Sequence, residues 1–187
     1  MSVSENLTKV REEINEAARR AGRDPGDVTL IAVSKTKPVS LIKEAVAAGA
    51  ADLGENKPQE ITAKYPEFEG DNVRWHMIGH LQKNKVRHII DKVELIHSVD
   101  SVELAEEINK RAAAIDKIQK ILIQVNVTGE DSKSGISPQD TEELCRRISE
   151  LDNVRIMGLM TISVNGYTYE ENKKVFESLA GLAARID

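Results

Sequence analysis

Residues 28–49, VTLIAVSKTKPVSLIKEAVAAG, contain one complete strand–helix unit, and the same pattern recurs along the chain. The apolar run at residues 29–33 is typical of a buried strand. Residues 39–49 place apolar side chains three and four positions apart, which is the spacing of a helix face. A polar segment that includes Lys35 and Lys37 joins the two. The stretch therefore predicts a strand that is followed at once by an amphipathic helix.

A leading helix at residues 7–21 precedes this unit, and five further units follow it. We expect strands at residues 28–34, 51–56, 73–79, 93–100, 120–127 and 154–162, and helices at residues 39–49, 57–65, 82–92, 101–115, 137–151 and 169–186. Regular alternation of strands and helices predicts an α/β fold with parallel strands inside and helices outside.

Two architectures fit this alternation, a (β/α)8 TIM-type barrel and an open, doubly wound sheet. No low-complexity linker divides the chain, so we expect a single domain over residues 1–187. An eight-stranded barrel needs two strands more than the six units supply. The fold is therefore expected to be either an open sheet or a barrel truncated at its C-terminus.

Composition excludes several classes of function. The net charge of −5 and an aromatic content of 3% argue against a nucleic-acid-binding surface. No apolar run approaches the roughly 18 residues that a membrane span needs. The chain has one cysteine, Cys145, and its N-terminus lacks the apolar segment of a secretory signal. We expect a cytoplasmic protein that binds neither nucleic acid nor membrane.

Polar residues follow the predicted strands where each strand ends. Examples are Lys35 after the first strand, Asn56 after the second and His80 after the third. In parallel α/β folds the carboxyl ends of the strands carry the functional site. These positions are therefore candidates for binding or catalysis.

Lys35 allows two interpretations. It shares a strand face with Ile31 and Val33, and partial shielding from water there would favour the neutral, nucleophilic amine that forms Schiff bases. The alternative is a strand-end lysine whose ammonium group reaches water. The sequence of this stretch alone favours the second interpretation.

Two other groups of residues have simple alternatives. His76 and His80 have the i, i+4 spacing of a zinc pair on a helix, but they follow a strand pattern and have no acidic residue between them. Hydrogen-bonding roles are favoured, and no metal is expected. The basic residues of the segment 83–88 fit a solvated helix face better than a phosphate or nucleic-acid patch.

Six motifs together resemble one family. They are AVSKTKP at residues 32–38, LGENKPQE at 53–60, WHMIGHLQKNK at 75–85, IHSVDS at 96–101, ILIQVNVTGEDSKSGI at 121–136 and IMGLMTI at 156–162. In this order and spacing they are similar to the pyridoxal phosphate homeostasis proteins, from about residue 5 to the C-terminus. The resemblance implies a single barrel like the N-terminal domain of alanine racemase.

The resemblance also implies a cofactor and its site. Pyridoxal 5′-phosphate (PLP) would be held as a Schiff base by the lysine of AVSKTKP, which is Lys35. The remaining positions that match the family's cofactor site are Asn56, His76, Met160, Lys37 and Lys133, the last two as further lysines near the barrel mouth. Family members continue into two more strands whose turns bind the phosphate, and neither turn occurs in these 187 residues.

The implied function is that of a carrier or buffer of PLP in vitamin B6 and amino-acid homeostasis. Its partners would be PLP and PLP-dependent apo-enzymes, and the chain would be a monomer without catalytic activity of its own. The alternative is a PLP-dependent racemase or decarboxylase of the same fold type, for which 187 residues leave no room for a second domain. A Schiff-base aldolase without cofactor is a third interpretation of the same lysine.

Overall fold

The structure is a computed structural model that describes residues 2–130 and 134–186. Six parallel strands form one sheet, and each strand pairs with its neighbours in chain order. The strands are β1 Ile31–Val33, β2 Asp52–Glu55, β3 Arg74–Met77, β4 Val93–Val99, β5 Gln119–Gln124 and β6 Val154–Met160.

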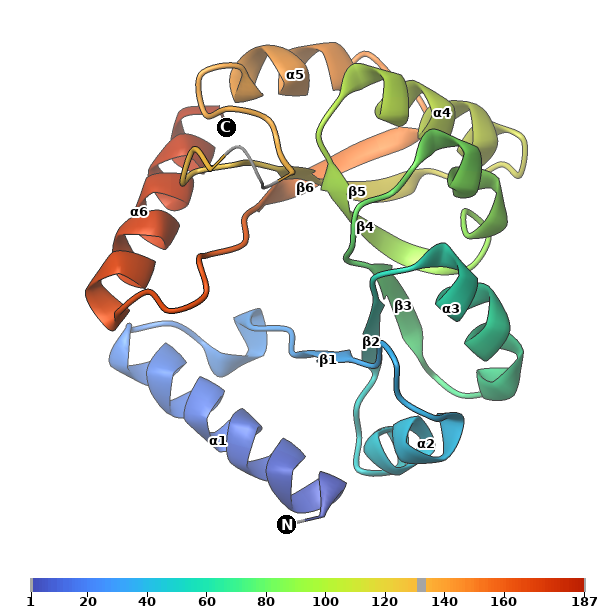
Figure 1. Cartoon of the computed structure of the whole chain (residues 1–187), viewed down its shortest axis with the longest axis vertical. Helices are drawn as coiled ribbons and strands as arrows, with labels where there is room; N and C mark the ends of the chain where they lie inside the picture. Colours follow the sequence, from blue (N-terminus) through green and yellow to red (C-terminus); the bar gives the residue numbers. More distant parts are fainter. Residues whose placement is uncertain (1, 131–133, 187) are drawn as a thin grey trace.

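Helices connect the strands and lie outside the curved sheet (Figure 1). The α-helices are α1 Val3–Arg20, α2 Val39–Ala47, α3 Pro58–Lys64, α4 Val102–Ala113, α5 Thr141–Ile148 and α6 Tyr169–Ile186; the short 3₁₀ helices are η1 Pro25–Asp27, η2 Tyr65–Phe68 and η3 Lys83–His88. In the described part of the chain, no helix is long and apolar enough to cross a membrane.

The core lies between the sheet and these helices. In β3, Trp75 and Met77 are buried, and the ring of Phe68 meets Trp75 edge to face at 5.7 Å. His76 lies between them in sequence, so its side chain points to the opposite face, the inside of the curved sheet. The same alternation places Asp52 inside and Leu53 outside in β2.

Strand order decides between the two expected architectures. A doubly wound sheet reverses its strand order at a switch point, whereas the order here runs from β1 to β6 without reversal. The predicted α/β fold of TIM-barrel type is therefore confirmed, with the described strands forming an open arc that has β1 and β6 at its edges (Figure 1).

Several predicted elements differ from the structure; the helix predicted at residues 137–151, for example, is the shorter α5. The first strand was predicted at residues 28–34, but β1 covers Ile31–Val33 only, the residues that pair with Asp52–Gly54 of β2. The predicted helix at residues 82–92 is the 3₁₀ helix η3. Val86 and Ile89 are both buried, and their three-residue spacing fits 3.0 residues per turn as well as 3.6.

Candidate functional site

A cavity of about 520 Å³ opens at the carboxyl ends of the strands. Its volume lies within the roughly 300–1,000 Å³ of small-molecule sites. The described residues that line it come from the ends of all six strands and from the loop after β5: Val33, Lys35, Asn56, Ile78, Gly79, His80, His97, Gln124, Val125, Asn126, Ser134, Met160 and Ile162. A larger hollow of about 700 Å³ lies along β6 between α5 and α6, but it holds none of the predicted site residues.

The structure brings three of the predicted site residues together and separates the others. Lys35, Asn56 and Met160 all line this cavity, whereas Lys37 is exposed and His76 is buried, and neither of these two is a lining residue. Lys133 lies outside the described residues. The convergence follows from the parallel sheet, which gathers strand ends at one edge.

Lys35 lies in a turn directly after β1 and is exposed. Of the two interpretations of this stretch, the structure fits the strand-end lysine whose side chain reaches water, which the stretch alone favoured. Lys35 follows the end of β1 by two residues, so it leaves the packed strand face and reaches the open rim. No described residue is hydrogen-bonded to its Nζ atom.

The backbone on both sides of Lys35 is held by α3. Lys64 donates from Nζ to the carbonyl oxygen of Ser34 at 2.9 Å, and Glu60 accepts from the N–H of Thr36 at 2.8 Å. Thr36 has φ of 61°, in the left-handed region that β-branched residues rarely adopt. The contacts from α3 therefore hold a strained turn in place.

A buried charge cluster supports these contacts. Lys64 also donates to Oε1 of Glu55 at 2.7 Å and to Oε2 of Glu60 at 2.9 Å. Burial lowers the pKa of Lys64, but hydrogen bonds and charge from Glu55 and Glu60 outweigh it and raise the pKa above its ordinary value. The hydrogen bond from the Thr36 N–H, followed by that from Lys64, lowers the pKa of Glu60. Both groups are thus charged at neutral pH.

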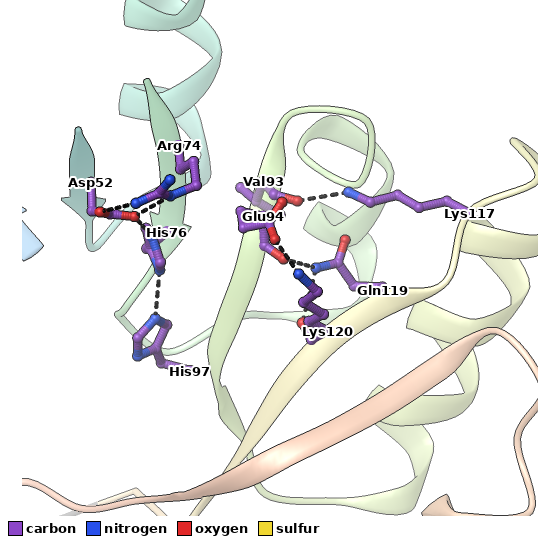
Figure 2. Close-up of polar contacts among 9 residues, drawn as sticks. All are labelled: Asp52, Arg74, His76, Val93, Glu94, His97, Lys117, Gln119 and Lys120. Carbon is purple, nitrogen blue, oxygen red and sulfur yellow. Dashed lines mark hydrogen bonds and ion pairs between the residues drawn. The ribbon is translucent and has the colours of Figure 1, made fainter. Parts of the chain in front are cut away.

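A second polar network crosses the inside of the sheet (Figure 2). Arg74 donates from Nε and Nη2 to the two carboxylate oxygens of Asp52, at 2.7 and 2.5 Å. Nε2 of His76 lies 2.9 Å from Oδ1 of Asp52, and Nδ1 of His76 lies 2.9 Å from Nε2 of His97. His97 is a lining residue of the cavity, so the network connects the sheet interior to the rim.

Asp52 and His97, two members of this network, differ in their charge at neutral pH. Burial raises the pKa of Asp52, but the hydrogen bonds from Arg74 and His76 outweigh it and lower the pKa below its ordinary value. Burial, with a smaller effect of the His76 charge, lowers the pKa of His97 from 6.5 to about 4. Asp52 is therefore a carboxylate and His97 a neutral imidazole at neutral pH.

Two glycines allow the rim segments to approach closely. A side chain at Gly79 would collide with the backbone of Asn56, the cavity residue after β2. Gly135 has φ of 127°, and a Cβ atom there would lie 2.8 Å from the backbone nitrogen of Asn126. Both positions therefore require glycine if the cavity is to keep its shape.

The two histidines of the sequence HMIGH point to different places. His76 is buried inside the sheet, while His80 is exposed at the cavity rim. Among the described residues, no cluster of three histidine, cysteine or acidic side chains is arranged to hold a metal ion.

Comparison with known proteins gives the family. A model of the alanine racemase N-terminal domain matches residues 6–187. The pyridoxal phosphate homeostasis protein of Aquifex aeolicus is 41% identical over 182 residues, which are 97% of this chain and 80% of that protein. This chain belongs to the pyridoxal phosphate homeostasis protein family. The prediction from its six motifs is confirmed.

Other members of this family agree. The pyridoxal phosphate homeostasis protein of Pseudomonas aeruginosa is 44% identical over 161 residues, covering 86% of this chain and 70% of that protein. The structure of PipY from Synechococcus elongatus PCC7942 with PLP bound is 34% identical and has a TM-score of 0.85, covering 99% of this chain and 82% of that chain.

His97 is the lining residue that sequence reasoning missed most clearly. It lies inside the quoted motif IHSVDS, but no role was assigned to it. Part of the evidence for it was in the sequence, because Leu95 and His97 are two residues apart and therefore lie on the same face of their strand. Only the pairing of His76 with Leu95 shows that this face is the one that carries His76.

Proposed function

We propose that this pyridoxal phosphate homeostasis family member binds PLP covalently through Lys35 and carries it without catalysing a reaction. The observation that carries the proposal is the convergence of Lys35, Asn56 and Met160 on one cavity of about 520 Å³ at the strand ends. A relative of 34% identity was solved with PLP bound, which supports the same ligand here.

The residues of the cavity fit a substituted pyridine aldehyde. Val33, Ile78 and Val125 offer apolar surface for a flat ring, and the side-chain amide of Asn56 offers a donor and an acceptor for its polar substituents. Lys35 would hold PLP through a C=N bond between its amine nitrogen and the aldehyde carbon, with the aldehyde oxygen released as water. When bound, PLP supplies a reactive aldehyde that the protein stores in this form.

The carrier role is supported by the exposure of Lys35. Enzymes that use such cofactors exclude water to protect reactive intermediates and to strengthen electrostatic interactions. A reactive group at an open rim suits storage and release better than turnover. Delivery to PLP-dependent apo-enzymes, a monomeric state, cytoplasmic location and one domain over residues 1–187 stay predictions.

Borohydride trapping tests the covalent bond. The protein is incubated with PLP, reduced, digested and mapped, and the absorption band of the C=N bond is recorded before reduction. We expect one labelled peptide that contains Lys35, and a loss of at least 90% of label in Lys35→Ala. Lys37→Ala, two residues away and outside the cavity lining, should keep most of the label, and Lys9→Ala on the exposed face of α1 is the matched surface control.

Full label in Lys35→Ala, mapped to another lysine, would contradict the proposed site. The same preparations are assayed for racemisation and decarboxylation with a panel of L-amino acids. We expect no turnover above that of PLP alone in buffer. Turnover by the wild type that disappears in Lys35→Ala would make the protein an enzyme.

A further inference from the structure

The hydrogen-bonded series Asp52–His76–His97 rises through the inside of the sheet toward the cavity. His76 pairs in register with Gly54, two residues beyond Asp52 on β2, and Leu95 pairs with His76, two residues before His97 on β4. Each step to the next strand therefore climbs two residues toward the carboxyl ends. Figure 2 shows the three side chains linked in this order, with Arg74 bound to Asp52 at the end of the series opposite His97.

The protons in this series have a direction. A carboxylate can only accept, so Nε2 of His76 must carry a hydrogen that it donates to Asp52. Arg74 already supplies the positive charge that balances Asp52, so a neutral His76 satisfies this contact. Neutral His76 then has a lone pair on Nδ1, and Nε2 of His97 must be the donor at 2.9 Å.

The remaining nitrogen of His97 is thereby fixed as an acceptor. Because Nε2 of neutral His97 carries the hydrogen, Nδ1 carries a lone pair. The side chain is nine-tenths buried and lines the cavity, and no described residue is hydrogen-bonded to Nδ1. An acceptor of this kind calls for a donor on whatever occupies the cavity.

We infer that Asp52 and His76 are positioning residues that lock His97 in its Nε2-protonated tautomer, so that Nδ1 accepts a hydrogen bond from an N–H or O–H group of the bound ligand. The inference deepens the proposed function, because a substituted pyridine such as PLP offers such donors in a protonated ring nitrogen and a ring hydroxyl. The tautomer itself is a property of the unliganded protein.

The tautomer is measured first, without any ligand. Nitrogen-15 NMR of histidine-labelled protein distinguishes a protonated ring nitrogen from one with a lone pair, and His97→Asn assigns the signals. We expect His97 to have its hydrogen on Nε2. A hydrogen on Nδ1 of His97 in the wild type at neutral pH would overturn the inference, whether or not PLP binds.

The role of Asp52 is tested on an Arg74→Met background, which removes the competing guanidinium. Arg74→Met alone keeps a carboxylate that only accepts, and spectra recorded at roughly pH 9 keep His76 neutral in the absence of the guanidinium, so the His97 tautomer should stay as in the wild type. Adding Asp52→Asn supplies an amide that can accept or donate, so both His97 tautomers should be populated. An unchanged single tautomer in the double variant would overturn the assignment of Asp52 as a positioning residue.

Two substitutions at His97 then separate its two nitrogens. The amide of Asn reaches the position of Nδ1, and the amide of Gln reaches the position of Nε2. The probe is 4-deoxypyridoxine 5′-phosphate, a PLP analogue without the aldehyde, so that binding does not depend on Lys35. We expect His97→Gln to weaken binding about tenfold, while His97→Asn keeps affinity within about threefold of the wild type.

Equal affinity of the two variants, or the reverse order, would overturn the acceptor role. Circular dichroism and Trp75 fluorescence confirm that each variant is folded. If the proposed function is wrong, a different experiment shows it, because Lys35 then carries no label after borohydride reduction.

Discussion

At the scale of single residues, Lys35 and His97 differ in the burial and the hydrogen bonding of their side chains. The Lys35 side chain is exposed and has no hydrogen-bond partner among the described residues, while the backbone on either side of it is held by Glu60 and Lys64. His97 is buried and hydrogen-bonded through one ring nitrogen. Within the described part of the chain, the Lys35 amine thus has no side-chain contact that restrains it on a backbone held at both sides, whereas the proposed acceptor is held through its other ring nitrogen.

Burial of neutral His97 should make stability depend on pH. The folded protein keeps His97 neutral down to about pH 4, whereas the unfolded chain binds a proton near pH 6.5. Between these values the unfolded state binds more protons, so the free energy of unfolding falls as the pH is lowered. At 1.36 kcal/mol per pH unit, His97 contributes a loss of about 3 kcal/mol across this range.

Urea unfolding between pH 4 and 7 measures this effect. His97→Asn should flatten the slope in this range, while His88→Gln, which changes an exposed histidine on η3, should leave it as in the wild type. An undiminished slope in His97→Asn would mean that another group causes the acid sensitivity. The lowered pKa of Asp52 affects stability at a more acidic pH, since the stabilisation from ionised Asp52 is lost only as the pH falls below about 4.

At the scale of elements, α3 links the second strand–helix unit to the first. Its Lys64 contacts the turn after β1 and the buried Glu55 at the end of β2. One oxygen of Glu55, Oε2, is buried without a hydrogen-bond partner among the described residues. Because Glu55 is fully buried, the Lys64 ammonium is the charge that compensates it.

Lys64→Met should therefore destabilise the protein strongly. Removing one partner of a buried ion pair costs about 3–5 kcal/mol, because the remaining charge is left uncompensated. Chemical denaturation measures the loss. The double variant Glu55→Gln with Lys64→Met should recover at least half of it, since the charge of the fully buried Glu55 is then removed, while the partly exposed Glu60 still accepts from the N–H of Thr36.

A surface ion pair gives the matched control. Arg146 contacts Glu143 on the exposed side of α5, where both side chains are about three-fifths exposed, so Arg146→Met should leave the free energy of unfolding close to that of the wild type. Losses of equal size in Lys64→Met and Arg146→Met would show that the cluster beneath Lys35 is no more important than a surface pair.

At the scale of the whole molecule, the charges of the cavity bear on which part of PLP is recognised. Among the described lining residues, Lys35 is the single lysine or arginine. If the Lys35 amine is used in the bond to the aldehyde, the phosphate dianion meets no other strong cation of that lining. Recognition by these residues then rests on the ring and the aldehyde.

We therefore expect little discrimination by the phosphate group in this 187-residue chain. PLP and 5′-deoxypyridoxal, which lacks the phosphate and cannot close into a hemiacetal, should bind with affinities within about tenfold, or 1.4 kcal/mol. Absorbance titrations of both aldehydes measure the ratio, with Lys35→Ala as the blank. A preference for PLP of a hundredfold or more would place a phosphate-binding group among residues that the described lining does not include.

The sequence by itself determined the alternation of elements and the place of the site. Apolar periods of 2 and 3.6 are local, so strands such as residues 120–127 and helices such as 101–115 could be predicted from their own residues. The strand-end rule then brought Lys35, Asn56 and His80 to one rim, where the structure has them. Where a local pattern fits two structures, as at η3, the prediction was wrong.

Only the tertiary structure decided which side chains meet beneath that rim. The series Asp52–His76–His97 depends on the register of three strands, and a slip of one residue would turn any of the three to the other face. The two hydrogen bonds by which α3 holds the turn at Lys35 join residues that are 24 and 30 positions apart in the chain, and they form because the helix packs against the sheet. Such contacts are set by distances in space, and no spacing along the chain encodes them.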